Sequence, residues 1–464
     1  MLWLPIDRNL DSSLTRQIYQ QIRQKILKGE LKADEKLPAS RDLAANLQVS
    51  RNVILEAYEQ LAAEGYVRGQ QGSGTYVASG AYLEEISPKE VPLFIPSANL
   101  KENQKNLIDF RSGIPALDLS PREKWGQLFR RICSENQPNI FSYDNPEGSW
   151  KLREVLCGYL RRTRGVQCQA DQLVITLGAM QGLFLVALLL LSARDEVLIE
   201  DPIQFNIQKI FSFPGSSLFP IPVDDYGIRT DLFPKDRKPA LIFVTPSHQF
   251  PLGGVLPIQR RVDLIQFARK AGCYIVEDDY DSEFRYEGPP VDSLQGLDPE
   301  RVIYVGTFSK ILFPGLRLGY LVLPYPLVEK CRYLKLISGK HCDSLEQLTL
   351  AHFIQEGYLE KHLAKIKKAY FLRRQTLIKS LESHFSNQVT ITGTSTGLHL
   401  IAHFHQVEFT KEILDRLEQG GVRVYPVELH AISSGRHPNK IILGYSHLDT
   451  KEITKGIKRM KAIL

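Results

Sequence analysis

Residues 12–78 show apolar positions with the spacing of short amphipathic helices. One helix is predicted by an apolar residue at every fourth position, at Leu14, Ile18, Ile22 and Ile26, and Gly29 stops it. A second short helix is predicted with Ser40 as its N-cap, and a third with Ser50 as its N-cap. Their expected buried positions are Leu43, Ala44, Leu47, Val53, Ile54, Ala57, Tyr58 and Leu61. Two short helices joined by a tight turn predict a helix-turn-helix.

The same segment ends in a predicted hairpin. Residues 66–67 and 75–77 have strand character, and the glycine-rich residues 72–74 lie between them, which predicts a small wing. Because recognition helices present their first turn to base edges and neighbouring groups to phosphates, DNA contacts are predicted in both helices and in the wing. The predicted DNA contacts are Arg41, Ser50, Arg51, Asn52, Gly72, Ser73 and Thr75. The alternative is a three-helix packing module with solvated polar caps.

The pattern changes twice after this segment. From residue 79 to 106 it becomes polar and proline-containing, which predicts a linker between a first domain over 1–78 and a second over 107–464. In the second domain, apolar runs alternate with helical stretches, as in an α/β fold with a mainly parallel sheet. Its clearest predicted strands are 173–176, 197–199, 241–244, 274–276 and 302–305.

Composition narrows the class of protein. With 464 residues, 43% hydrophobic and 24% charged, the chain is not expected to be disordered or fibrous. The longest apolar run, 183–191, is too short for a membrane span, and the first residues lack a secretion signal, so we expect a cytoplasmic protein without membrane association. The six cysteines are scattered and predict reduced thiols and no metal site. The net charge of +6 permits a polyanionic partner without requiring one.

Candidate chemistry lies where the predicted strands end. Lys310 follows Thr307 and Ser309, and a lysine in a partly dry pocket has a lowered pKa and can form a Schiff base with an aldehyde. Pyridoxal 5'-phosphate (PLP) is the common aldehyde partner. It also needs a carboxylate at its ring nitrogen, a donor at its phenolic oxygen, and a cradle for its phosphate.

The sequence offers each of these groups. Asp278 closes a predicted strand, Tyr280 follows it, and Ala179 and Met180 open a predicted helix directly after another strand. Taken singly, a lysine here is more often a surface residue, and an aspartate more often a helix cap. Their joint occurrence at successive strand ends favours a PLP site.

Several motifs resemble known families. The run 37–52, LPASRDLAANLQVSRN, together with GSGTYV at 72–77, resembles the GntR-type winged helix-turn-helix. TFSK at 307–310 with RLGY at 317–320, and EDDY at 277–280, resemble the lysine and ring-nitrogen motifs of class I aminotransferases. The order of winged helix, linker and aminotransferase-like domain resembles the MocR subfamily of GntR regulators.

The resemblance implies roles for individual residues. Lys310 would form the Schiff base with PLP, Asp278 would hold the ring nitrogen, and Tyr280 the phenolic oxygen. The phosphate would be bound by Thr307, Ser309, Arg317 and the backbone amides of Ala179 and Met180. Tyr143 falls where a tyrosine reaches the cofactor of the partner subunit, which implies a homodimer with shared sites.

Three positions depart from the aminotransferase pattern. Ile442 stands where an arginine generally holds the substrate carboxylate, and isoleucine cannot make that charge-assisted pair. Gln204 stands where an aromatic residue stacks on the cofactor ring, so that either Phe205 takes over with a small register shift or the stacking is lost. Phe250 replaces an asparagine.

Two functions follow from this pattern. The first is a PLP-dependent transcription regulator that binds a double-stranded DNA operator as a homodimer and senses PLP or an amine. The second is a working aminotransferase with an appended winged helix. Because Ile442 removes the usual substrate anchor, the sequence favours the regulator without physiological turnover.

Overall fold

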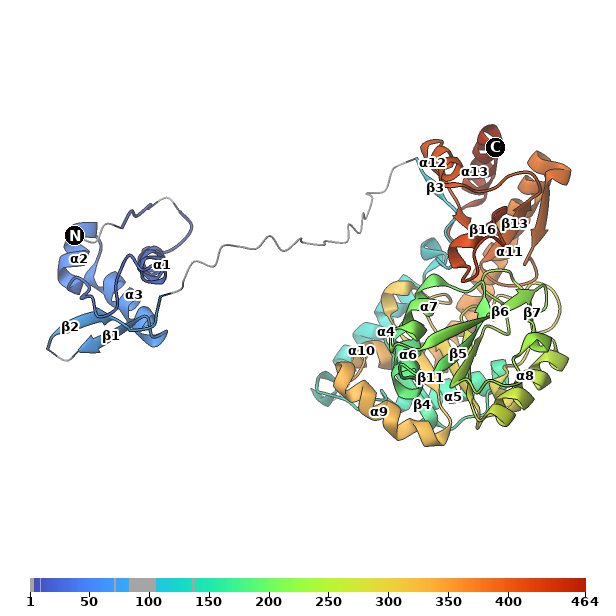
Figure 1. Cartoon of the computed structure of the whole chain (residues 1–464), viewed down its shortest axis with the longest axis horizontal. Helices are drawn as coiled ribbons and strands as arrows, with labels where there is room; N and C mark the ends of the chain where they lie inside the picture. Colours follow the sequence, from blue (N-terminus) through green and yellow to red (C-terminus); the bar gives the residue numbers. More distant parts are fainter. Residues whose placement is uncertain (1–3, 9, 71, 83–105, 136–137) are drawn as a thin grey trace. The chain divides into compact units, whose positions relative to one another are not determined.

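The computed structural model describes residues 4–8, 10–70, 72–82, 106–135 and 138–464. It divides into two compact units, Met1–Leu100 and Lys101–Leu464 (Figure 1). The predicted linker over 79–106 lies largely outside the described residues.

The first unit is a three-helix module with a hairpin. Its elements are α1 (Leu14–Leu27), α2 (Ser40–Leu47), α3 (Arg51–Ala63), β1 (Val67–Gln70) and β2 (Gly74–Val77). The apolar faces of all three helices meet at Ile22, Leu43 and Ile54, each fully buried, and the hairpin adds buried valines to this core. Ser50 is the N-cap of α3 as expected, but the N-cap of α2 is Ala39 and not Ser40, which is already helical.

The second unit is built on an eight-stranded sheet with the order β4-β11-β10-β9-β8-β5-β6-β7. The strands from β10 through β9, β8 and β5 to β6 are parallel, whereas β4, β11 and β7 pair antiparallel with their neighbours. Their bounds are β4 (Leu173–Thr176), β5 (Glu196–Asp201), β6 (Ser217–Asp224), β7 (Gly227–Ile228), β8 (Leu241–Val244), β9 (Tyr274–Asp279), β10 (Val302–Thr307) and β11 (Gly319–Val322).

Strand residues alternate between the two faces of this sheet, as period-2 geometry requires. In β5, Val197 and Ile199 pack with the buried side chains of α6 (Ala179–Leu190), α7 (Phe205–Ser212) and α9 (Tyr325–Gly339). Leu198, between them, packs instead with those of α8 (Ile258–Ala271). Both faces are therefore covered by helices, which explains why these strands read as continuous apolar runs.

A smaller lobe completes the second unit. Its four-stranded antiparallel sheet has the order β12-β13-β16-β15, and a separate parallel pair joins β3 to β14. These strands are β3 (Ile108–Asp109), β12 (Val389–Thr392), β13 (His399–Phe404), β14 (Val422–Arg423), β15 (Tyr425–Pro426) and β16 (Lys440–Gly444). The remaining helices are α4 (Arg122–Glu135), α5 (Trp150–Arg164), α10 (Ser344–Gln355), α11 (Tyr358–Phe385), α12 (Lys411–Gln419) and α13 (Thr450–Ile463).

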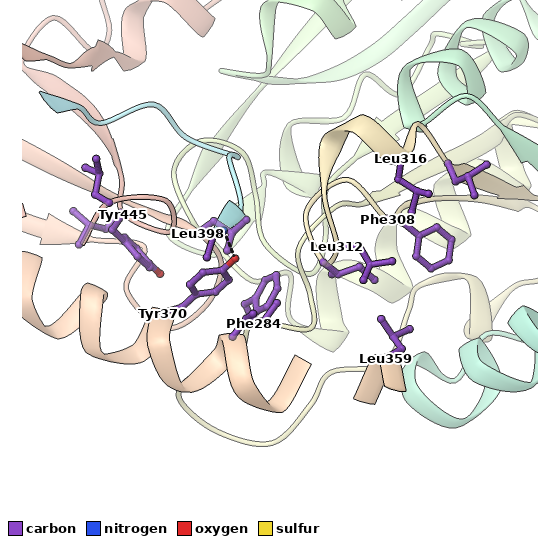
Figure 2. Close-up of a cluster of buried hydrophobic side chains, with 14 of the residues drawn as sticks. Phe284, Phe308, Leu312, Leu316, Leu359, Tyr370, Leu398 and Tyr445 are labelled. Atoms are coloured by element: carbon purple, nitrogen blue, oxygen red, sulfur yellow. Dashed lines mark hydrogen bonds between the residues drawn. The ribbon is translucent and has the colours of Figure 1, made fainter. Parts of the chain in front are cut away.

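The segment after β10 is fixed by an apolar cluster. Phe308, Leu312 and Leu316 are almost fully buried, and Leu359 from the start of α11 lies beneath them (Figure 2). The Phe308 carbonyl accepts a hydrogen bond from the Leu312 amide at 2.9 Å. This packing holds the backbone on both sides of Lys310.

Candidate functional site

A pocket opens where β9 and β10 end and α6 begins. Its lining brings together eight of the nine predicted cofactor residues, which come from segments far apart in the chain. These eight are Ala179, Met180, Asp278, Tyr280, Thr307, Ser309, Lys310 and Arg317. Ligands of open α/β sheets bind at this edge, beyond the carboxyl ends of the parallel strands.

Lys310 reaches across the pocket to a loop that the sequence did not point to. Its Nζ donates a hydrogen bond to the Gly113 carbonyl at 2.6 Å. Burial lowers the pKa of Lys310, and the nearby carboxylates Asp281 and Asp278 oppose this shift. A lysine held in this way is nearer to the neutral, nucleophilic amine than a surface lysine is.

Asp278 carries the clearest sign of a missing partner. It is buried, and its Oδ1 has no hydrogen-bond partner among the described residues. Burial, together with the charge of Asp279, raises the pKa of Asp278 to about 7. Asp279 itself is fully engaged, since it accepts from Arg164 Nε at 2.7 Å and from the Tyr304 hydroxyl at 2.5 Å. The pocket therefore presents one buried carboxyl that a protonated ring nitrogen would satisfy.

Tyr280 belongs to a buried polar group that sequence reasoning missed. Its hydroxyl lies 3.0 Å from His248 Nδ1, and the same nitrogen lies 2.9 Å from Asp281 Oδ2. His399 packs against the His248 ring and hydrogen-bonds through Nε2 to the Pro251 carbonyl at 2.9 Å. Burial lowers the pKa of His399 to about 3, so this pocket-lining ring is neutral.

The start of α6 forms a cradle for an anion. Gly178, the N-cap, has φ of 82°, a conformation that favours glycine and turns the chain from β4 into the helix. Arg317 lies alongside and donates through Nη2 to the Leu177 carbonyl at 2.8 Å. The positive end of the helix, this guanidinium and the hydroxyls of Thr307 and Ser309 line one side of the pocket. These residues fit a phosphate group.

Two aromatic candidates do not line the pocket of their own chain. Tyr143 is 77% exposed, and Lys340 Nζ lies 3.7 Å from the centroid of its ring. Phe205 begins α7 and is 49% exposed, whereas Gln204 lines the pocket. Of the two alternatives for this position, the placement of Phe205 outside the lining favours loss of the stacking ring over its replacement by Phe205.

The position of the missing arginine is filled by apolar packing. Ile442 is fully buried with Ile401 and Val427, and Phe250, which lines the pocket, packs against this cluster. Arg423, on β14 of the same lobe, pairs with Glu418 at 2.8 Å and lies outside the lining. Phe250 is thus the member of this apolar cluster that reaches the pocket.

The predicted DNA contacts form exposed groups on the first unit. Arg41, Ser50, Arg51, Asn52, Gly72 and Ser73 are exposed, and Thr75 is half-buried. Arg51 Nε donates to Ser40 Oγ at 3.3 Å, which ties the start of α3 to α2. Their contacts with DNA stay a prediction.

Comparisons with known proteins match both units. Residues 14–77 match the family described as bacterial regulatory proteins, gntR family, and residues 105–459 match aminotransferase class I and II. The fold and pocket thus define an aminotransferase class I and II domain preceded by a gntR-type helix-turn-helix. The chain belongs to the MocR subfamily of GntR-type transcription regulators.

Relatives share this organisation over most of their length. The probable rhizopine catabolism regulatory protein MocR of Rhizobium meliloti is 34% identical over 99% of this chain and 95% of its own. The pyridoxine biosynthesis regulator PdxR of Corynebacterium glutamicum is 32% identical over 84% of this chain and 83% of its own.

A solved structure supports the fold of the second unit. The α-aminoadipate aminotransferase LysN of Thermus thermophilus, complexed with N-(5'-phosphopyridoxyl)-L-leucine, has a TM-score of 0.72 and 26% identity, covering 80% of this chain and 95% of its own. The family and the fit of the pocket residues indicate PLP as the cofactor of this domain. Within the described residues, no helix combines the length and apolar character needed to cross a membrane.

Proposed function

We propose that this regulator binds operator DNA as a cytoplasmic homodimer and senses PLP, or an amine that reacts at the PLP site. One observation carries the proposal. The pocket keeps the lysine, the aspartate and the phosphate cradle, while Ile442 and its apolar neighbours occupy the place of the substrate arginine. The site is thus suited to holding the cofactor and poorly suited to turning over amino acids.

Each pocket residue has a task toward the cofactor. PLP supplies an aldehyde that condenses with a primary amine, with loss of water, and a ring that withdraws electrons. Lys310 Nζ, with its lowered pKa, presents the amine. Asp278 would keep the proton on the ring nitrogen, and Tyr280 would donate to the phenolic oxygen. Arg317, Thr307 and Ser309 would bind the phosphate.

The chemistry of the lining restricts the effector. Lys310 and Arg317 are the cationic side chains among the described lining residues, and both serve the cofactor. His399 is neutral, and Phe250 and Leu398 are apolar. An α-carboxylate would find no charged partner there. This supports PLP itself, or an amine without a carboxylate, as the effector, in line with a relative named for pyridoxine biosynthesis.

The exposed Tyr143 supports the homodimer. Its ring is not used inside its own pocket and is available to a second copy of the chain. A dimer would also present two helix-turn-helix units to the two halves of an operator, as DNA-binding domains of this kind require for specific binding.

An absorption spectrum of the full-length protein with PLP tests the proposal first. We expect a band of lysine-bound cofactor that K310A loses, and a DNA affinity for the protein's own promoter region that changes on adding PLP or an amine. Absence of promoter binding with and without PLP would contradict the regulator. Steady formation of keto acid from an amino donor, abolished in K310A, would favour the aminotransferase instead.

A further inference from the structure

Two cysteines form a close pair outside the pocket. Cys157 lies on α5, and Cys168 follows that helix in the segment leading to β4. Their sulfur atoms are 3.4 Å apart, and the Cys157 thiol also donates to the Cys168 carbonyl at 2.8 Å. Since the sulfurs of a disulfide are about 2.05 Å apart, they have to approach by roughly 1.4 Å to form a bond.

Both cysteines are buried, but each lines a surface hollow, and we expect a small oxidant to reach the pair through these hollows. One hollow is lined by Cys157 with Trp150 and Asp171, and the other by Cys168 with Gln167, while Arg161 lines both. Arg161 Nη2 donates to the Cys168 carbonyl at 3.3 Å, so its positive charge stands at the pair. A cation beside a thiol stabilises the thiolate, which is the reactive form.

The surroundings of the pair shift the pKa values of its two thiols in opposite directions. The hydrogen bond from Cys168 and the charge of Arg161 lower the pKa of Cys157 to about 7, whereas the pKa of Cys168 is raised. Burial raises the pKa of Cys273 to about 11 and that of Cys331 to about 12. Cys157 is thus the more acidic thiol of the pair and its candidate nucleophile, and on ionisation it gives up the hydrogen bond to the Cys168 carbonyl.

We propose that Cys157 and Cys168 are a peroxide-oxidisable pair that closes into an intramolecular disulfide. The Cys157 thiolate attacks one oxygen of hydrogen peroxide, the O–O bond breaks, and the other oxygen leaves as water after taking up a proton. The resulting sulfenic sulfur is attacked by Cys168, the S–S bond forms, and the S–O bond breaks to release a second water with the Cys168 proton. Two thiols are oxidised and one peroxide is reduced.

A disulfide at this position would constrain segments that lead toward the pocket. The loop that it closes contains Arg164, whose guanidinium holds Asp279 beside the unpartnered Asp278. The chain continues from Cys168 into β4 and then to Gly178 at the anion cradle. A bridge would therefore join α5 to the segment that leads through β4 to the anion cradle.

The test is peptide mapping of the full-length protein after a short exposure to hydrogen peroxide, blocking with N-ethylmaleimide, and digestion without reductant. Arg161, Arg162 and Arg164 lie between the two cysteines, so trypsin places them on separate peptides. We expect a reductant-sensitive cross-link between these two peptides as the main product. We also expect Cys157 to react with iodoacetamide at neutral pH at least about tenfold faster than Cys273.

Two variants sharpen the result. C168S should lose the cross-link and accumulate a sulfenic acid at Cys157 that dimedone captures, because no second thiol is left to resolve it. C133S, which removes a half-buried cysteine on α4, should leave the cross-link unchanged. The proposal is wrong if peroxide leaves the wild-type pair as thiols, or if cross-links through Cys133 dominate.

Discussion

Two adjacent aspartates in β9 show how strongly a single residue's surroundings set its role. Asp279 is satisfied by Arg164 and Tyr304, and so contributes to the framework of the sheet. Asp278, one position earlier, lines the pocket and has an oxygen with no hydrogen-bond partner in the described part of the chain. Neighbours of the same type thus divide into a structural carboxylate and one that is available to a ligand.

This contrast predicts opposite effects of the same substitution. The pKa of Asp278 is raised to about 7 in the folded protein, above its usual 3.8. The folded, cofactor-free protein therefore loses stability as pH rises from 3.8 toward 7, and the penalty persists above that. D278N removes the penalty, so at pH 8 the free energy of unfolding should rise by on the order of a few kcal/mol, with little gain at pH 4. Urea denaturation of both proteins at pH 4 and at pH 8 measures these free energies of unfolding.

D279N is the matched control. It leaves the buried Arg164 without its charge partner and should lower the free energy of unfolding by about 3–5 kcal/mol. D278N should also weaken PLP binding, because an amide does not stabilise a protonated ring nitrogen. Equal destabilisation by both variants would show that Asp278 is an ordinary structural carboxylate.

Residue-scale prediction from the sequence depended on local spacing. Lys310, Thr307 and Ser309 could be placed because they follow a predicted strand within one motif. Gly113 and His399 could not, since they reach the pocket from distant loops and strands through the packing of the smaller lobe. Asp281 was the nearest missed signal, because it directly follows Tyr280.

Two strands extend further than the sequence predicted, and for β9 the reason is physical. The predicted strands ended at residues 276 and 305, whereas β9 reaches Asp279 and β10 reaches Thr307. Charged residues usually mark a strand end, but β9 continues through three of them, and two, Glu277 and Asp279, have partners inside the fold. The Glu277 carboxylate accepts from the backbone amides of Leu294 and Gln295 at 2.9 Å each. The sequence pattern does not reveal such a distant partner, so it predicts strand existence better than strand length.

The start of α6 is the element whose geometry we expect to matter most for phosphate binding. G178A places a Cβ 3.3 Å from Arg317 Nη2 and forces a side chain onto a residue with φ of 82°. The variant should displace both the helix start and the guanidinium, and so weaken PLP affinity by at least about tenfold, at a cost in stability of about 1 kcal/mol. Titration of the PLP absorption band measures this, and G272A, at the positive-φ C-cap of α8 with open space around it, is the control.

At the scale of the molecule, DNA binding and cofactor binding are predicted to be separable. R51A removes an exposed cation at the start of α3, and should weaken binding to the promoter by about tenfold while leaving the PLP spectrum unchanged. R130A removes one exposed charge from the second unit and should alter neither property. Gel-shift titration at two salt concentrations distinguishes the variants, and equal losses would locate the DNA contact elsewhere.

The shared-site homodimer predicts complementation between two defective subunits. If Tyr143 serves the partner's cofactor, a mixed dimer of K310A and Y143A carries both defects in one site and none in the other. Half of its sites should then bind PLP with wild-type affinity, although each parent homodimer binds poorly. Isolation of the mixed dimer with two different tags, followed by PLP titration, measures this. No recovered sites would mean that Tyr143 acts within its own subunit, and wild-type PLP affinity of the Y143A homodimer would mean that Tyr143 has no role at the cofactor.

The helix α11 gives the second unit a mechanical property. It is one continuous helix, and its Leu359 supports the segment around Lys310 (Figure 2). Further along the helix, Tyr370 packs on Phe284 (Figure 2). Arg373 donates a hydrogen bond to the Ser446 carbonyl of the smaller lobe. The eleven residue steps from Leu359 to Tyr370 span about 16 Å at 1.5 Å per residue. A stiff rod of that length behaves as a lever arm, so a tilt of about 5° displaces its far end by roughly 1.4 Å. Small angular changes at the lysine are thereby converted into ångström-sized displacements of the lobe.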